Sequence, residues 1–235
     1  AVSNTAGSIT SSVSANPTAG FSIAEYTGNA TAGATVGHGL GVEPDMVIVK
    51  ARARSGGSDW VVYHRGISNS QNGWIRLNLN NAWATTSIIW NNTAPSSSVV
   101  TLGSYDYVND SGTSHIMYSF ANVEGHQKAG SYTGNGSTDG TFINCGFRPA
   151  FVMIKCTNAA ESWNIFDSAR DPNNITKLNL NPNVSNAESD AESGNRAIDI
   201  LSNGFKCRGS NSSINNGSYI YLAIAEQPFK YANAR

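Results

Sequence analysis

The sequence predicts an all-β protein made of two tandem β-sandwich modules of the jelly-roll type, related by an internal duplication. Three observations lead to this prediction: blocks of sequence return in the same order, short β-branched runs alternate with turn clusters, and no sustained helical periodicity occurs. The modules either form separate sandwiches or share one pseudo-symmetric core. We place an N-terminal arm or linker at residues 1–20, the first module at 21–128 and the second at 129–235.

The internal repeat consists of paired blocks that lie about 105 residues apart. The pairs are 25–29 with 131–135, 43–50 with 148–155, 59–63 with 162–166, 76–80 with 177–181, and 115–121 with 219–225. Because the blocks keep their order along the chain, chance similarity is a poor explanation. We therefore expect the two modules to fold in the same way.

The strands expected in each module follow from local composition. The runs 46–50 and 151–155 are continuous, rich in hydrophobic residues, and preceded by a proline, as in strands buried on both faces. The runs 75–79 and 219–225 alternate or carry the β-branched and aromatic residues that favour a pleated sheet. Clusters of Asn, Asp, Ser and Gly between the runs are turn signals. Residues 186–193 have room for a single helical turn at most.

The first twenty residues lie outside the repeat and are rich in Ser, Thr, Ala and Gly. One interpretation is a linker or mobile arm. The other is that the run Ser8–Val13 leaves its own module and adds a strand to the sheet of a neighbouring subunit. Ile9 and Val13 are an even number of positions apart, so they would face the same side of such a strand. They are the predicted anchors of an assembly arm.

Composition excludes several classes of partner and of chemistry. The chain has 16 acidic and 15 basic residues, and charged residues make up 13% of it. Without a clustered basic excess, we predict no nucleic-acid partner and no membrane partner. No histidine or cysteine spacing is typical of a metal site, so we predict no metal, no cofactor and no catalytic residue. Cys145, Cys156 and Cys207 are expected to be free thiols, the first two filling space near the buried strand of the second module.

The tryptophans are the most informative functional signal. Trp60 and Trp163 match across the repeat, which predicts that they belong to the cores. Trp74, Trp83 and Trp90 have no counterpart in the second module. Unmatched aromatic residues on a polar β module are candidates for stacking on a sugar or for anchoring an interface, and plain packing is the alternative.

Several motifs resemble those of a known family. They are residues 37–50, 59–65, 130–137, 146–155 and 228–235. Together they resemble an uncharacterised β-rich domain of structural and tail-associated proteins of tailed phages, which often follows a concanavalin-like region near the C-terminus. The resemblance covers nearly everything from Phe21 onward. It implies a role at the surface of a virion or filament, and it brings no catalytic residues.

These observations predict a non-enzymatic structural subunit of a virion appendage or an extracellular filament. We expect it to assemble with copies of itself or with other virion proteins, at a virion surface or outside the cell. The alternative is a carbohydrate-binding, adhesive module whose partners are glycans. A third hypothesis, a glycan-cleaving enzyme, would require a cleft with two facing carboxylates.

Overall fold

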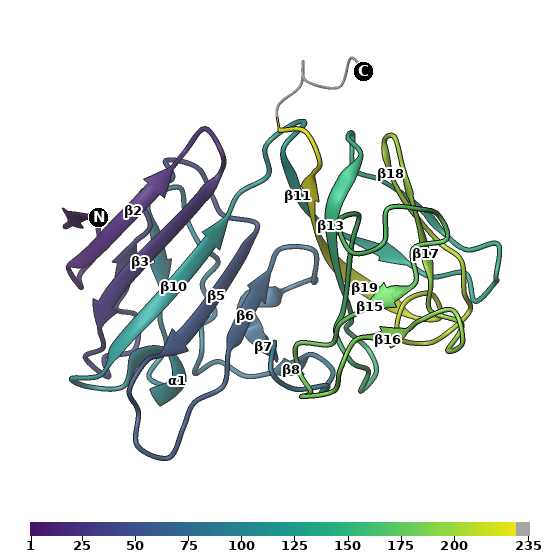
Figure 1. Ribbon diagram of the computed structural model, residues 1–235. Helices are drawn as coiled ribbons and strands as arrows, with labels where there is room; N and C mark the ends of the chain where they lie inside the picture. The colour runs from purple at the N-terminus through teal and green to yellow at the C-terminus, as the bar shows by residue number, and fades with distance from the viewer. Residues whose placement is uncertain (229–235) are drawn as a thin grey trace. The chain divides into compact units, whose positions relative to one another are not determined.

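The structure is a computed structural model that describes residues 1–228 (Figure 1). Residues 229–235, the last part of the family resemblance, lie outside the described residues. The chain divides into two compact units. Unit 1 comprises residues 1–77 and 83–122, and unit 2 comprises residues 78–82 and those from 123 onward. In the described part of the chain, no helix is both long and apolar enough to cross a membrane.

Unit 1 is built on an eight-stranded antiparallel sheet. Its elements are β1 (Val2–Asn4), β2 (Ser11–Asn16), β3 (Phe21–Thr27), β4 (Thr35–Gly37), β5 (Met46–Ala51), β6 (Val61–His64), η1 (Ser70–Asn72), β7 (Gly73–Arg76), β8 (Ala84–Thr85), β9 (Val99–Thr101), α1 (Asp106–Asn109) and β10 (Ser114–Phe120). The strand order in the large sheet is β1-β2-β3-β10-β5-β6-β7-β8, of which β2 to β8 can be followed in Figure 1. A second sheet is formed by β4 and β9. The short helix α1 leads into the central strand β10.

Unit 2 is a sandwich of a four-stranded and a three-stranded sheet, with a further two-stranded ribbon. Its strands are β11 (Gln127–Thr133), β12 (Phe142–Asn144), β13 (Pro149–Cys156), β14 (Asn164–Asp167), β15 (Leu178–Asn179), β16 (Ser189–Asp190), β17 (Ile198–Leu201), β18 (Gly204–Cys207) and β19 (Ser218–Ala225). The sheets have the orders β11-β19-β13-β14 and β12-β18-β17, and β15 pairs with β16. The all-β sandwich class predicted from the sequence is confirmed.

Each unit has a hydrophobic core of its own. In unit 1 the core joins residues of β5 to Met117, Trp90 and Leu102. In unit 2 it joins the two sheets through residues such as Ile154 and Phe205, and it includes all three cysteines. The separate-sandwich alternative therefore holds, because the two cores share no residue. The cysteines are buried and free, as predicted.

The two units use the same order of four strands. In unit 1 this order is β3-β10-β5-β6, and in unit 2 it is β11-β19-β13-β14. The predicted buried runs 46–50 and 151–155 thus occupy corresponding central strands, and most of their residues are buried. A common origin of the units by duplication stays a prediction that this correspondence supports.

A buried asparagine stands at the same place in each unit. The Asn109 side-chain amide donates to the Gly103 carbonyl at 2.9 Å, and the Asn215 amide donates to the Gly209 carbonyl at 2.9 Å. Both asparagines are fully buried. We call Asn109 and Asn215 the anchor asparagines, because each ties down the loop that precedes the central strand of its sheet.

A tyrosine reaches toward each of these loops from the neighbouring strand. The Tyr26 hydroxyl donates to the Val108 carbonyl at 2.6 Å, and the Tyr132 hydroxyl donates to the Ile214 carbonyl at 2.6 Å. Burial raises the pKa of both tyrosines, so the hydroxyls remain donors at neutral pH.

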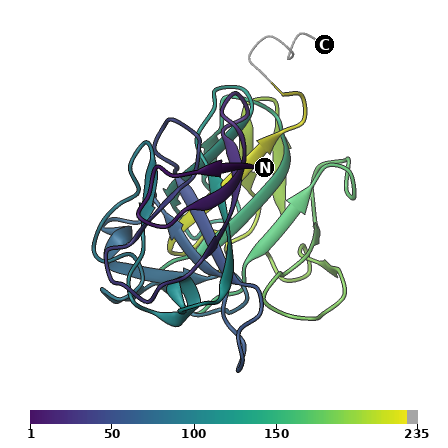
Figure 2. The same cartoon turned by 90° about the vertical axis from the view of Figure 1, so that its left-hand side faces the viewer.

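The prediction of a separate N-terminal arm is wrong. Residues 1–16 supply β1 and β2, and β2 pairs with β3 along its whole length. Ile9 and Val13 are buried in the core of unit 1, so they cannot anchor an arm that leaves it. The serine-rich composition was misleading because β2 alternates: Ser11 and Val13 face inward, whereas Ser12 and Ser14 face solvent. Figure 2 shows the N-terminal strand, in the darkest purple, at the surface of unit 1.

Candidate functional site

Three half-buried aromatic rings gather at one end of unit 1. Trp74 lies on β7, and Tyr105 and Tyr107 belong to the segment that forms α1. All three pack against the edge of the core without being absorbed into it. We call Trp74, Tyr105 and Tyr107 the aromatic cluster.

Two of the three ring pairs in the aromatic cluster meet edge to face, and the third is tilted. The Trp74 and Tyr105 centroids are 5.6 Å apart with planes at 84°, and those of Tyr105 and Tyr107 are 4.8 Å apart at 66°. Trp74 and Tyr107 are 6.2 Å apart at 38°. Such pairs are preferred because the positive edge of one ring meets the negative face of the next. Burial, then the neighbouring Tyr107, raises the pKa of Tyr105, so the Tyr105 phenol is neutral at pH 7.

Two arginines flank the rings. The Arg76 guanidinium lies 4.4 Å from the Trp74 ring centroid, and the Arg54 guanidinium lies 5.5 Å from that of Tyr107. Each arginine also holds a carboxylate: Arg76 binds Asp59 at 3.2 Å, and Arg54 binds Asp106 at 2.7 Å. The hydrogen bond to Asp106 raises the pKa of Arg54. The cluster therefore combines aromatic surface with planar hydrogen-bonding groups of both charges.

The loop that carries the tyrosines is fixed from below by the anchor asparagine of unit 1. Besides the Gly103 carbonyl, the Asn109 amide donates to the Thr31 carbonyl at 3.0 Å, and its oxygen accepts the Asn29 N–H at 2.9 Å. Because Asn109 is held by three backbone groups, the loop is tied to a second loop of the unit. The tyrosines are therefore presented on a preorganised support.

The structure brings one of the three predicted tryptophans to this site. Trp74 is part of the cluster, whereas Trp90 is fully buried in the core of unit 1 and meets Tyr63 edge to face at 6.0 Å. Trp83 is half-buried and covers Gly73, where an added Cβ would lie 2.5 Å from its ring. Trp90 therefore packs within the unit, and the plain-packing alternative holds for it, whereas for the half-buried Trp83 both alternatives stay predictions.

Tyr105 and Tyr107 were missed from the sequence. A signal was present, since the segment Gly103–Asn109 has the tyrosines where Gly209–Asn215 has Asn211 and Ser213. Among the matched tryptophans, Trp163 is buried as predicted, whereas Trp60 is only half-buried and stacks on Tyr118 at 6.4 Å.

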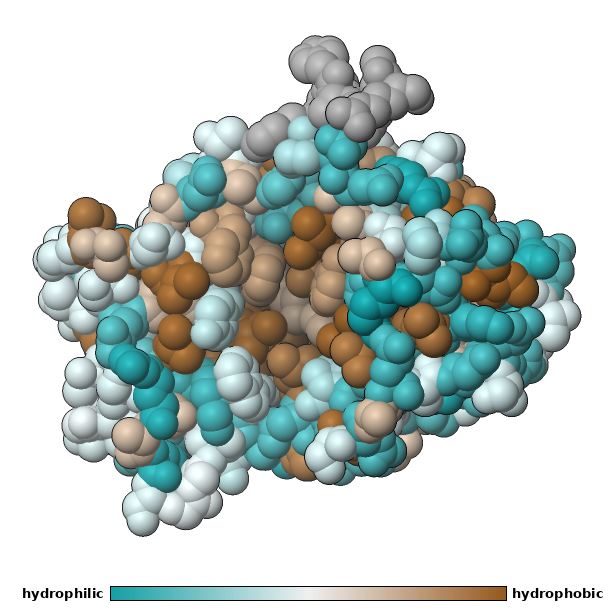
Figure 3. Space-filling model, viewed as in Figure 1, coloured by the Kyte–Doolittle hydropathy of each residue, from teal (hydrophilic) through white to brown (hydrophobic). Residues whose placement is uncertain are grey.

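Outside the cluster, residues 1–228 also carry half-buried aromatic pairs, of which Phe21 and Phe120, 5.0 Å apart, are one. Figure 3 shows hydrophilic and near-neutral residues over much of the visible surface, with hydrophobic residues interspersed. The large hydrophobic residues that are exposed in the described part of the chain are Val2, Val42, Ile88, Phe142, Leu180 and Val184. Only one of them, Phe142, is aromatic. Residues 1–228 also contain no group of three or more side chains suited to hold a metal ion.

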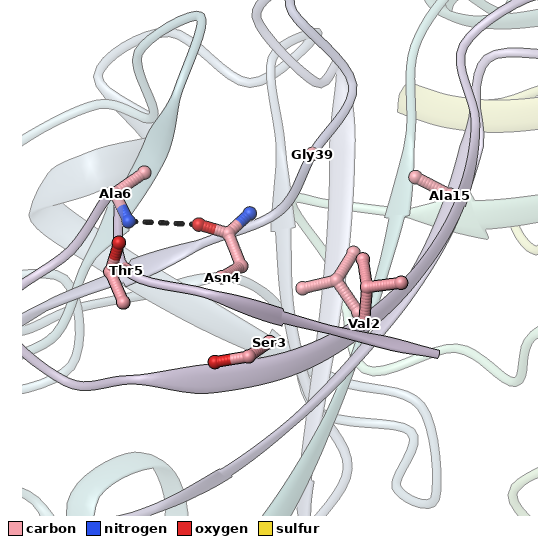
Figure 4. Close-up of a pocket in the computed structure, with 8 residues that line it drawn as sticks. Val2, Ser3, Asn4, Thr5, Ala6, Ala15 and Gly39 are labelled. Atoms are coloured by element: carbon pink, nitrogen blue, oxygen red, sulfur yellow. Dashed lines mark hydrogen bonds between the residues drawn. The ribbon is translucent and has the colours of Figure 1, made fainter.

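A second candidate surface lies at the edge of the large sheet of unit 1. A groove of about 490 Å³ runs beside β1 (Figure 4), and it is lined by Val2, Ser3, Asn4, Thr5, Ala6, Val13, Ala15 and Gly39. The Asn4 side-chain oxygen accepts the Ala6 N–H at 2.8 Å, which fixes the turn after β1. Val2 is 71% exposed at this edge. An edge strand with small side chains beside it can accept a further strand.

Comparison with known protein families gives one match. The profile described as "Domain of unknown function (DUF7483)" matches residues 1–228. The match runs across both units and includes the N-terminal strands. Neither the curated proteins nor the solved structures yielded a match.

Proposed function

The chain belongs to the DUF7483 family of domains of unknown function, and we propose that it is a non-enzymatic carbohydrate-binding protein. The aromatic cluster of unit 1 is the proposed binding site. The proposed setting is an extracellular structure or the surface of a virion, where an adhesive module would meet glycans.

The observation that carries this proposal is the half-buried aromatic cluster flanked by Arg54 and Arg76. A sugar ring has an apolar face of C–H groups, which packs on an aromatic ring, and a rim of hydroxyls, which need donors and acceptors. Planar guanidinium and carboxylate groups supply both kinds of partner beside the rings. Binding sites commonly pair an aromatic surface with a few placed polar groups in this way.

Affinity electrophoresis in gels that contain a soluble β-glucan, mannan or xylan tests this proposal. We expect at least one polysaccharide to retard the intact protein, and Trp74→Ala to lower the affinity about tenfold, which is ~1.4 kcal/mol. Phe142→Ala is the matched control, because Phe142 is an exposed aromatic residue of unit 2. Retardation of Trp74→Ala equal to that of the intact protein, or no retardation in any gel, would contradict the proposal. Release of reducing sugar would contradict its non-enzymatic part.

A second candidate function is that of a structural subunit that assembles through β1. The specific observation in its favour is the exposed edge strand with the adjoining groove. The proposed occupant is a strand of a second copy, whose backbone would pair with β1 while a side chain enters the groove. This replaces the released arm expected from the sequence.

The assembly hypothesis predicts association that depends on the β1 edge. Val2→Lys places a charge on that edge, a device that blocks strand addition. We expect light scattering and negative-stain images to show shorter or fewer assemblies for Val2→Lys. Val42→Lys is a suitable control, since Val42 is exposed and does not line the groove. A monodisperse monomer for the unsubstituted protein at high concentration would exclude self-assembly.

A further inference from the structure

The loop that carries the tyrosines in unit 1 has a counterpart in unit 2 with smaller side chains. Counted back from the two anchor asparagines, Tyr105 and Tyr107 correspond to Asn211 and Ser213. The hydrogen bonds of the anchors fix this alignment independently of any sequence comparison. Where unit 1 has two aromatic rings, unit 2 has an amide and a hydroxyl.

Unit 2 has a groove at this place. It measures about 270 Å³ and is lined by Glu161, Ser162, Gly194, Arg196, Asn211 and Ser213. The lining residues come from the three loops that follow β13, β16 and β18. The volume is of the size of one small ligand or one residue of a polymer.

The walls of the groove are held by hydrogen bonds that leave its inner groups in fixed positions. The Asn211 amide donates to the Gly194 carbonyl at 3.0 Å, and the Asn211 side-chain oxygen accepts the Ser213 N–H at 2.9 Å. The Glu161 carboxylate accepts a hydrogen bond from the Ser212 hydroxyl. Three loops are thus linked to one another before any ligand arrives, which lowers the entropic cost of binding.

Two polar groups of the groove have no partner within the described residues. The hydroxyl of Ser213 is buried and makes no hydrogen bond, although the residue is only 3% exposed. Burying a polar group without a hydrogen bond is unfavourable, so a ligand that supplies the missing partner is favoured at this position.

The second such group is the Arg196 guanidinium, for which no hydrogen bond and no ion pair is found. It differs in this from the other arginines of residues 1–228. Those that form ion pairs are Arg52, Arg54, Arg65, Arg76, Arg148, Arg170 and Arg208. An arginine stays charged at any physiological pH, and its flat fork matches a carboxylate.

We propose that this groove binds a carboxylate-bearing, hydroxylated ligand, of which a uronic acid residue of an acidic polysaccharide is the fitting class. The Arg196 guanidinium binds the ligand carboxylate through two parallel hydrogen bonds. Ring hydroxyls of the ligand donate to the Glu161 carboxylate and exchange a hydrogen bond with the Ser213 hydroxyl. This proposal rests on groups of unit 2 alone. It can therefore be tested independently of the carbohydrate site proposed at the aromatic cluster of unit 1.

The test uses the full chain, labelled with ¹⁵N, and titrates it with three probes. D-Glucuronate carries both the carboxylate and the hydroxyls, D-glucose carries only the hydroxyls, and acetate carries only the carboxylate. We expect glucuronate to shift the Arg196 side-chain N–H and the backbone amides of Gly194 and Ser213. We expect glucose and acetate to bind at least tenfold more weakly.

Substitutions then assign the interaction to the groove. Arg196→Gln should weaken glucuronate binding at least tenfold, and Arg196→Lys should restore only part of it, because a lysine keeps the charge and loses the fork. Ser213→Ala should weaken glucuronate binding severalfold. It provides an independent test of the groove in case the Arg196→Gln variant does not fold. Arg208→Gln is the matched control, since Arg208 lies in the same unit and pairs with Asp199 at 3.4 Å.

The possible outcomes separate the parts of the proposal. Absence of glucuronate binding, or binding unchanged in Arg196→Gln, would overturn it. Equal affinity for acetate would overturn the saccharide assignment, and equal affinity for glucose would overturn the role of the carboxylate. Unaltered glucuronate binding in Trp74→Ala is expected, and a loss there would place the ligand in unit 1 instead.

Discussion

Unit 1 and unit 2 share a framework and differ in what they place upon it. Both have the same four-strand order, an anchor asparagine, and a tyrosine that reaches the loop beside that asparagine. The loop itself presents two tyrosines in unit 1 and small polar side chains in unit 2. The comparison teaches that the same buried hydrogen bonds can support loops whose outer side chains differ in size and polarity.

The units also differ inside. Unit 1 extends its sheet with β1 and β2, whereas the corresponding sheet of unit 2 has four strands within the described residues. Unit 2 instead holds all three cysteines in its core, with Cys207 in contact with the Tyr132 hydroxyl at 3.7 Å. It also buries Lys155 completely, whereas the corresponding Lys50 of unit 1 is half-exposed. Because of these contrasts, substitutions can be chosen whose effects on stability are expected in one unit and not in the other.

The largest effect is expected from removing residues 1–16. This deletion takes away β1 and β2 together with Ile9 and Val13 of the core, so unit 1 should lose at least about 4 kcal/mol of stability. Calorimetry should show a lowered transition for unit 1 and an unchanged one for unit 2. Deletion of residues 1–4 alone is the control and should cost far less. An unchanged melting profile after the longer deletion would show that the N-terminal strands are dispensable.

The next largest loss of stability is expected from substitutions of the anchor asparagines. Asn109→Leu and Asn215→Leu should each cost about 3 kcal/mol, because each leaves several buried backbone groups without partners. Urea unfolding measures this free energy, and Asn186→Ala, at an exposed position, serves as the control. Similar losses of unfolding free energy in both units would show that the two anchor asparagines play equivalent roles. A large loss in one unit alone would contradict that equivalence.

The lysines should differ strongly between the units. Lys155 donates to the carbonyls of Asn80, Cys156 and Glu161 at 3.1, 2.8 and 2.8 Å. Lys155→Met removes these bonds and should cost about 2 kcal/mol. Lys50 donates to the Ser58 carbonyl, so Lys50→Met should cost less than about 1 kcal/mol. Denaturant unfolding measures both losses. Equal losses of unfolding free energy for the two variants would show that the hydrogen bonds of the buried Lys155 do not stabilise unit 2 more than the hydrogen bond of the half-exposed Lys50 stabilises unit 1.

The smallest net effect concerns alkaline pH, because two contributions oppose each other. Burial raises the pKa of Cys145 and Cys207 to about 12, so the stability they confer is present below the unfolded pKa of about 8.5 and is lost as pH rises above it. Each thiol should cost about 2 kcal/mol between pH 8 and pH 10. Burial lowers the pKa of Lys155 to about 8, so its cost, present below pH 8, is relieved between pH 8 and about 10.4.

Variants separate these two contributions. The Cys145→Ala, Cys207→Ala double variant should lose less stability than the unsubstituted protein between pH 8 and pH 10. Lys155→Met should lose more over the same range, since it lacks the relief. Urea unfolding at the two pH values measures both differences. Unit 1 contains no cysteine, so a pH-dependent loss confined to its transition would contradict the assignment to the thiols.

Local patterns were sufficient for part of this structure. The β-branched runs at 46–50 and 151–155 became central strands because short apolar runs of this kind are stable only when a sheet covers both of their faces. The repeated blocks correctly paired these two strands. For residues 1–20 the same reasoning failed, since serine and alanine have weak preferences and the neighbouring strand β3 decided their conformation.

The sequence by itself determined the all-β class, the position of the central strands and the free state of the cysteines, because these depend on composition and short-range pattern. Only the tertiary structure decided that Trp74 contacts Tyr105 and Tyr107, whereas Trp90 is fully buried in the core. It also decided that, within residues 1–228, Arg196 lines a groove with Glu161 and that the buried Ser213 hydroxyl makes no hydrogen bond. Such facts depend on which loops meet in space, and the contacts that bring loops together are made between residues far apart in the chain.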